Sequence, residues 1–157
     1  SFFIKHYKTL IKQNVQIIWQ TGTMQYNEIS NLITEKQVVI KPFIDNINIA
    51  YSCSDIVVSR AGAMAIEELK KFNKAMILIP YPDAANNHQK LNALELVDNN
   101  AACLIEQHNI ETKLINSILE LLKNDSKRLE MGANAKKLYN PNSLNLIIES
   151  IKEYIHV

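Results

Sequence analysis

Cysteine and long apolar runs are scarce in this chain of 157 residues. The two cysteines, Cys53 and Cys103, are too few and too far apart for a disulfide framework or a metal knuckle, so a reducing compartment is expected. The longest apolar stretch, residues 75–80, is far shorter than the about 20 residues that cross a bilayer. The sequence therefore predicts no transmembrane segment, and its start shows no signal-peptide pattern.

The chain also lacks a net charge of either sign. Seventeen basic side chains stand against sixteen acidic ones, which leaves a net charge of +1. This charge gives no field that would hold a nucleic acid backbone or an anionic membrane surface, so no nucleic acid partner is expected. With 47% hydrophobic and 21% charged residues, the composition is typical of one globular domain.

Short strands alternate with helices along most of the sequence. Apolar and β-branched runs predict strands at residues 15–20, 37–40, 56–59, 75–79 and 101–105. Helical spacing of apolar residues predicts helices at residues 2–13, 26–35, 46–54, 63–72 and 88–99. From residue 110 onward the pattern is helical, and Asn140-Pro141 begins the last helix, with proline in its first turn. The order predicts an α/β fold: a doubly wound, Rossmann-like parallel sheet of about five strands with a helical tail.

Ligands of such sheets bind at the carboxyl ends of the strands, so four loops are of interest. They are residues 21–25, 42–46, 59–63 and 80–89. The chain has three glycines, and two of them, Gly22 and Gly62, lie in these loops. Glycine permits positive φ or close approach of a ligand, so a chain this poor in glycine is expected to keep it where one of these is needed.

The loop that contains Gly62 joins a strand to a helix and is a candidate phosphate site. Free backbone N–H groups and the positive end of the helix dipole point into the cleft there. A glycine at this position could equally serve tight packing, and Arg60 could form a surface ion pair. Spacing alone leaves both alternatives open.

Glu68 lies in the helix that follows, and its carboxylate could accept hydrogen bonds from both hydroxyls of a ribose. Its neighbour Glu67 should face elsewhere. The alternative is that both are solvated helix charges beside Lys70 and Lys71.

His88, Gln89 and Asn92 begin the next helix, and their imidazole and amide groups suit sugar hydroxyls. The alternative is a helix cap with a surface imidazole. The other histidines, His6, His108 and His156, have no carboxylate or cysteine at useful sequence spacing. No Ser-His-Asp set in nucleophile-elbow context, Walker lysine or paired-carboxylate motif is found.

A series of short motifs in one order resembles the MurG family of bacterial glycosyltransferases. The motifs are Trp19-Gln20-Thr21-Gly22, Pro42-Phe43-Ile44, Ala50-Tyr51, residues 54–63, Glu68-Leu69, residues 77–82, Ala84-Ala85, His88-Gln89 and Asn92-Ala93. The resemblance is close over residues 15–105 and extends to the tail only in pattern. It implies the two-domain GT-B fold, whose carboxyl-terminal domain holds UDP-N-acetylglucosamine for transfer to lipid I in peptidoglycan synthesis.

The resemblance also implies a donor-binding set of residues. They are Thr21, Gly22, Phe43, Ile44, Arg60, Gly62, Ala63, Met64, Ala65, Glu68, His88, Gln89 and Asn92. In this set Phe43 and Ile44 line the uracil, and backbone groups near Ile44 read its edge. Thr21, Gly22 and the helix start at residues 63–65 approach the pyrophosphate, and Glu68 takes the ribose hydroxyls. His88 and Gln89 contact the donor sugar, and Asn92 supports their loop.

Two departures from the family pattern stand out. Ala65 occupies a position where many members carry a hydroxyl, so the backbone must bind the phosphate there. The family's first strand with its glycine-rich loop, and the whole amino-terminal acceptor domain, are not recognised in the chain. We therefore expect a fragment that binds donor without cofactor or metal. The catalytic base, the lipid I site and the docking patch for the cytoplasmic face of the inner membrane would belong to the full-length protein.

Three other interpretations remain open at this point. The chain could be a stand-alone UDP-sugar-binding subunit of a two-chain N-acetylglucosaminyltransferase. A UDP-sugar epimerase would need paired acid and base groups around the sugar, which the sequence does not reveal. A flavodoxin-like regulatory domain would need an acidic cluster, which Asp45, Asp55 and Asp83 do not obviously form.

Overall fold

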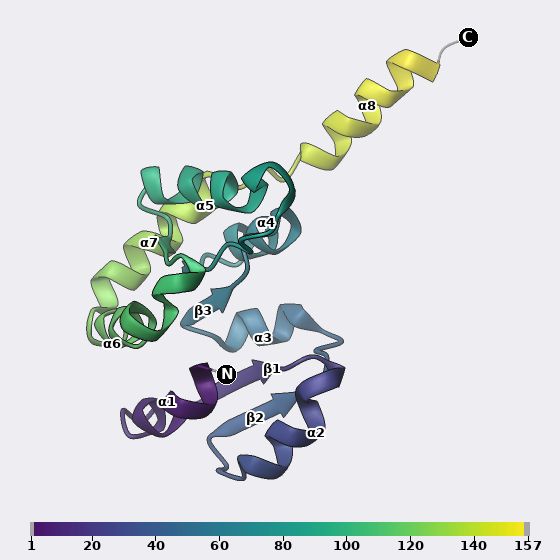
Figure 1. Cartoon of the computed structure of the whole chain (residues 1–157). Coiled ribbons are helices and arrows are strands. Elements are labelled where there is room, and N and C mark those ends of the chain that lie inside the picture. Colours follow the sequence, from purple (N-terminus) through teal and green to yellow (C-terminus); the bar gives the residue numbers. More distant parts are fainter. Residues whose placement is uncertain (1, 156–157) are drawn as a thin grey trace.

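The computed structural model describes residues 2–155, without the side chains of residues 143, 144, 147 and 153–155. The first half alternates helices with strands, as the sequence predicts (Figure 1). Its elements are α1 (Phe2–Ile11), β1 (Ile17–Gln20), α2 (Thr23–Leu32), β2 (Val38–Lys41), α3 (Ile47–Cys53) and β3 (Ile56–Ser59). The predicted helix at residues 26–35 begins three residues earlier, directly after Gly22.

The second half continues the alternation and then becomes helical. Its elements are α4 (Ala63–Lys71), β4 (Ala75–Leu78), the short η1 (Ala85–Asn87), α5 (His88–Asp98), β5 (Cys103–Leu104), η2 (Gln107–Asn109), η3 (Ile110–Leu114), α6 (Ile115–Lys123), α7 (Asp125–Lys137) and α8 (Ser143–Ile155). All five predicted strands are present, although β5 is shorter than expected.

The five strands form two parallel ladders instead of one continuous sheet. In one ladder β1 pairs with β2, and Ile17 lies opposite Val38. In the other, β4 pairs with both β3 and β5. The prediction of parallel pairing is confirmed, whereas the single sheet is wrong for the described residues, because no backbone pairing joins β1 to β3. Alternation of elements predicts strand direction but not which edges meet.

Apolar side chains on both faces of β4 organise the core. Met76 and Leu78 belong to one cluster, which also contains Leu69 of α4 and Leu96 of α5. A second cluster lies on the opposite face and includes side chains from α1, β4 and α6, namely Phe2, Leu10, Ala75, Ile77, Ile118 and Leu121. Helices therefore cover both faces, as expected for a doubly wound fold. Partly buried Ile17 of β1 and Ile56 of β3 also pack against the second cluster, which connects the two ladders.

The last helix, α8, extends away from the rest of the molecule (Figure 1). The amide of Leu146 donates to the carbonyl of Asn142 at 3.0 Å, so Asn142 flanks the first turn. Pro141 consequently lies before the helix, not in its first turn as predicted. No helix among residues 2–155 is both long and apolar enough to cross a membrane.

Asparagine supplies most of the left-handed turns in this glycine-poor chain. The described residues other than glycine with positive φ are all asparagines: Asn14, Asn73, Asn86, Asn87 and Asn100. Asparagine tolerates this conformation because its short side chain can bond locally to the backbone. Gly22 has φ 77°, but Gly62 has φ −70°, so positive φ does not explain the glycine at position 62.

Gly132 of α7 is a packing glycine, and its substitution should destabilise the fold. A Cβ atom added there would lie 2.4 Å from the backbone oxygen of Asn73, which cannot swing aside. We expect Gly132→Ala to lower the free energy of unfolding by about 1–3 kcal/mol, as overpacking does. Urea unfolding measures this, and Gly62→Ala is the control, because a Cβ atom there meets nothing within 4 Å. Equal stabilities of the two variants would contradict the packing role.

Candidate functional site

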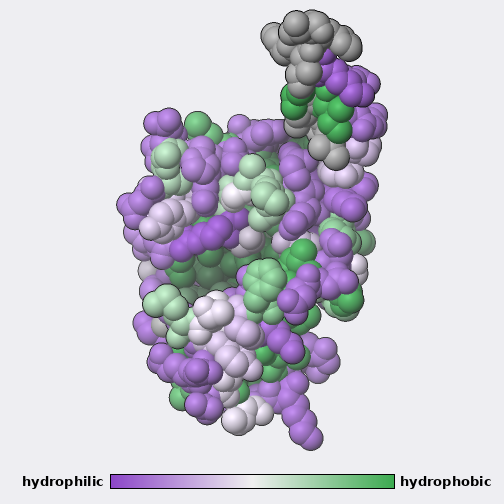
Figure 2. Space-filling view, turned by 90° about the vertical axis from the view of Figure 1, so that its right-hand side faces the viewer, coloured by the Kyte–Doolittle hydropathy of each residue, from purple (hydrophilic) through white to green (hydrophobic). Residues whose placement is uncertain are grey.

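The carboxyl ends of the strands bring the predicted ligand loops to one face of the molecule. Because pairing within each ladder is parallel, the loops after β1 and β2 share an edge, as do those after β3 and β4. Figure 2 shows this face, with a hollow between its upper and lower parts and hydrophobic residues at the bottom of the hollow. This is the location predicted for a ligand of a doubly wound fold.

The start of α4 offers backbone amides without a side-chain cap. Its N-cap residue is Gly62, and no side chain bonds to the first turn. The first amides of a helix have no intrahelical partner, so they are available to an anion. The space above Gly62 is open, which permits close approach. The Asn92 amide donates to the Ala61 carbonyl at 3.3 Å and thereby holds the loop before the helix.

A second helix begins on the same face in the same way. Gly22 is the N-cap of α2, again without a side-chain bond, and its φ of 77° strains any other residue. The Thr21 amide and hydroxyl both donate to the Lys41 carbonyl, at 2.9 and 3.3 Å, which ties this loop to the end of β2. Two uncapped helix starts therefore face the carboxyl edge.

The loop after β2 presents an exposed aromatic ring and an occupied amide. Phe43 is 63% exposed, as suits a platform for a planar group. The Ile44 amide, which the resemblance assigns to the nucleobase, donates to Oε1 of Gln20 at 3.0 Å. Gln20 was named only within a motif, without a role. Its place as the last residue of β1, next to a ligand loop, is the signal that could have identified it.

Hydrogen bonds within the loop after β4 fix the candidate sugar-binding residues. Asn86 and Asn87, both left-handed, lead into α5, and Nδ1 of His88 lies 2.7 Å from the Ala85 carbonyl. Oε1 of Gln89 accepts from the Tyr81 amide at 2.9 Å. The loop is therefore an ordered turn, and His88 and Gln89 lie at its end.

Glu68 and Glu67 diverge, as predicted. Glu67 pairs with Lys70 at 2.8 Å, whereas Glu68 is half-buried beside Tyr51 of α3. The Tyr51 ring is 8% exposed and lies 5.7 Å from that of Phe72, one helical turn beyond Glu68. Burial raises the pKa of Tyr51 to about 12, and the charge of Glu68 and a hydrogen bond to it act in the same direction. Tyr51 was named only within a motif, and its contact with Glu68 could not be read from sequence.

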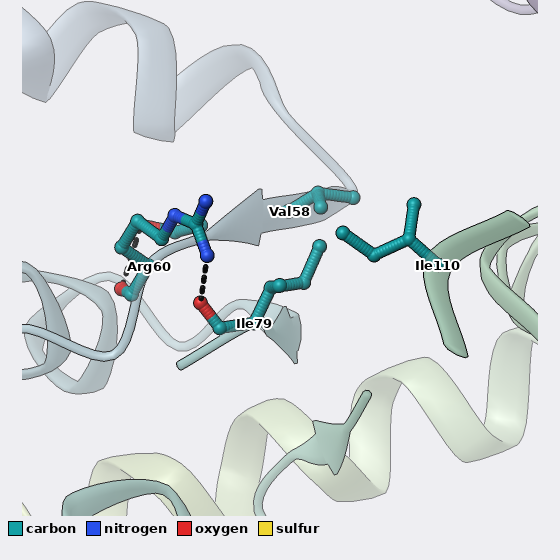
Figure 3. A pocket seen from close by; sticks show the side chains of 5 residues that line it. Val58, Arg60, Ile79 and Ile110 are labelled. Atoms are coloured by element: carbon teal, nitrogen blue, oxygen red, sulfur yellow. Dashed lines mark hydrogen bonds between the residues drawn. The ribbon is translucent and has the colours of Figure 1, made fainter. Parts of the chain in front are cut away.

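Arg60 forms no ion pair with any described carboxylate, so the surface ion-pair alternative is wrong. Nη1 donates to the carbonyls of Ile79 and Pro80, at 3.2 and 3.3 Å, and to Oε1 of Gln107 at 2.7 Å. The side chain borders a hollow of about 200 Å³ whose apolar lining includes Val58, Ile79 and Ile110 (Figure 3).

The remaining histidines do not assemble a site in the part of the chain that is described. His6 lies 3.9 Å from Glu111 and His108 lies 3.5 Å from Glu106, contacts that sequence spacing did not reveal. No group of three His, Cys, Asp or Glu side chains suited to a metal occurs among residues 2–155. His156 lies outside the described residues.

Residues 1–147 match the glycosyltransferase family 28 C-terminal domain. The chain belongs to this family. Among its relatives are two proteins named UDP-N-acetylglucosamine--N-acetylmuramyl-(pentapeptide) pyrophosphoryl-undecaprenol N-acetylglucosamine transferase. The Flavobacterium psychrophilum protein is 34% identical over 90% of this chain, and the Bacillus cytotoxicus protein is 35% identical over 96% of it.

A solved family 28 relative confirms the predicted GT-B type of Rossmann-like fold. The crystal structure of Acinetobacter baumannii MurG superposes on 97% of this chain with a TM-score of 0.80 at 25% identity. The chain spans 46% of that structure, and it spans 39% and 43% of the two relatives named above. The similarity therefore concerns less than half of each of these proteins.

The pKa of Tyr51 should be measurable as late ionisation. A raised pKa means that the neutral phenol is favoured in the folded chain, so the associated stability is complete below pH about 10 and is lost towards pH about 12. Ultraviolet absorbance is titrated against pH for the parent and for Tyr51→Phe, and the difference between the two curves isolates the ionisation of Tyr51. We expect a midpoint about two units above that of a free tyrosine. A midpoint near pH 10 would contradict the buried contact with Glu68.

Proposed function

We propose that this chain is the donor-binding half of an inverting N-acetylglucosaminyltransferase that converts lipid I to lipid II in peptidoglycan synthesis. The observation that carries the proposal is the pair of uncapped helix starts on one face of a family 28 domain, in which α4 also carries the half-buried Glu68. The names of the two relatives support UDP-N-acetylglucosamine as the donor.

The nucleotide would lie across the carboxyl edge of both ladders. The amides at residues 63–65 and the loop at Thr21 and Gly22 would bind the pyrophosphate, and the backbone would suffice at Ala65. Glu68 would accept hydrogen bonds from both ribose hydroxyls. Phe43 and Ile44 would contact the uracil, whose carbonyl would replace the Gln20 side chain at the Ile44 amide.

Transfer would proceed by attack of the acceptor hydroxyl on the anomeric carbon of the sugar. The new C–O bond forms as the bond to UDP breaks, with inversion, and the acceptor proton passes to a base. The dipole and free amides of α4 would stabilise the negative charge that develops on the departing diphosphate. The base, the lipid I site and peripheral attachment to the cytoplasmic face of the membrane are assigned to the remainder of a longer protein.

We also propose that one more strand, parallel to its neighbours, fits between β1 and β3 in the longer protein. Each of these strands pairs on one side, and both contribute to the cluster around Phe2. The Ile17 amide donates to the Gln37 carbonyl, towards β2, so by alternation the Ile18 amide faces away from β2. The Ser59 carbonyl accepts a hydrogen bond from the amide of Ile79, which directly follows β4. By the same alternation, the Val58 amide faces away from β4.

Hydrogen exchange tests the added strand. We expect the Ile18 and Val58 amides to exchange rapidly in this chain and to become protected in a protein of the relatives' full length. The Ile17 amide, bonded to Gln37 at 2.8 Å, is the internal control and should be protected in both. Equal protection of Ile18 and Val58 in the two proteins would show that nothing pairs with these edges.

Calorimetric titration with UDP-N-acetylglucosamine, UDP-glucose and UDP tests the donor site. We expect preferential binding of the first, weakened about tenfold by Glu68→Gln, because a charged acceptor makes a stronger hydrogen bond than a neutral amide. Glu67→Gln is the matched control, since it removes the same charge one residue away, where the side chain faces Lys70. Equal loss in both variants would overturn the ribose assignment, and no binding of any ligand by the parent would overturn the donor site.

A further inference from the structure

Three loops of the β3–β5 ladder converge on the side chain of Arg60. It belongs to the loop between β3 and α4, and its Nη1 group bonds the carbonyls of Ile79 and Pro80 in the loop after β4. The same nitrogen bonds Gln107, in the segment that follows β5, at 2.7 Å. The bond to Ile79 is visible in Figure 3. One guanidinium thus fixes the start of α4 relative to two neighbouring loops.

The contacts of Arg60 continue to Gln89 through Tyr81. The guanidinium carbon lies 5.6 Å from the centre of the Tyr81 ring, within range of a cation–π interaction. The Tyr81 amide in turn donates to Oε1 of Gln89 at 2.9 Å. Movement of Arg60 would therefore disturb Tyr81, whose backbone amide orients the Gln89 side chain.

A second connection reaches the same end of α5. Glu106, adjacent to Gln107, bonds Lys90 at 2.5 Å, and Lys90 directly follows Gln89. The hydrogen bond and charge of Lys90 lower the pKa of Glu106. Gln89 and its neighbour Lys90 are therefore bonded to two segments that Arg60 also contacts.

We propose that Arg60 is a positioning residue that sets the donor-sugar loop, residues 81–89, against the start of α4. This proposal rests on the proposed function, in which His88 and Gln89 contact the sugar and α4 binds the diphosphate. The planar guanidinium presents several donors in a fixed fork and stacks on an aromatic ring. A lysine keeps the charge near α4 but cannot make this set of contacts. Arg60 should therefore control recognition of the sugar more than affinity for the nucleotide.

The Arg60→Lys variant separates these two effects. We expect its affinity for UDP to stay within about twofold of the parent, because the charge and the α4 amides remain. Its affinity for UDP-N-acetylglucosamine should fall about three- to tenfold, the effect of losing one or two neutral hydrogen bonds. Calorimetry with each ligand measures the ratio of the affinity for UDP-N-acetylglucosamine to the affinity for UDP. The preference for UDP-N-acetylglucosamine over UDP-glucose should decrease in parallel.

Arg128→Lys is a matched control. Arg128 also donates from Nη1 to two carbonyls, those of Leu121 and Leu122, but these belong to α6. The control should leave the ratio of the two affinities unchanged. A ratio changed equally by both variants, or by neither, would overturn the proposal. Equal loss of UDP and UDP-N-acetylglucosamine in Arg60→Lys would instead indicate that the guanidinium holds the diphosphate directly, and would also overturn it.

Hydrogen exchange without nucleotide tests the same contacts independently of the proposed function. The Tyr81 amide should exchange faster in Arg60→Lys than in the parent, and at the parent rate in Arg128→Lys. An unchanged Tyr81 amide would overturn the positioning role even if ligand affinities changed. A parent chain that binds none of the nucleotides would overturn the proposed function and with it the sugar role, whatever the exchange of Tyr81 shows.

Discussion

Parallel pairing of β4 with β3 and β5 is the constraint on which the rest of the structure depends. It buries β4 on both faces, so helices must cover each face. It also brings the ends of β3, β4 and β5 to one edge, where the start of α4, the loop after β4 and the segment after β5 meet. Residues such as Arg60 and Gln89 are more than 25 positions apart in sequence, and they come together only because their loops follow strands that end at this edge.

Element order and the ligand loops could be predicted from sequence because they depend on local patterns. β-Branched runs identified β1 and β3, and Gly62 marked the start of α4, whereas the start of α2 was predicted three residues too late. The split between ladders could not be predicted, since alternation is identical in one sheet or two. The loop at residues 80–89 was expected from the element order, but the bond within it between Tyr81 and Gln89 depends on three-dimensional geometry.

Side-chain partnerships within the site were the least predictable feature. Glu68 was a candidate from its place in a helix, yet its contact with Tyr51 brings together α4 and α3. The bond of Gln20 to the Ile44 amide likewise joins β1 to the loop after β2. These contacts depend on how elements pack, whereas the residue types needed for binding are visible in the motifs themselves.

The separation of the two ladders also bears on folding cooperativity. The described contacts between them come from side chains of the cluster around Phe2, without the backbone ladder that makes a sheet one unit. Opening at this boundary would break side-chain contacts but no strand-to-strand hydrogen bonds, so it would cost less than separating paired strands. A nucleotide bound to the loops of both ladders would span this boundary. Ligand binding would then raise the free energy of opening and link the two ladders thermodynamically.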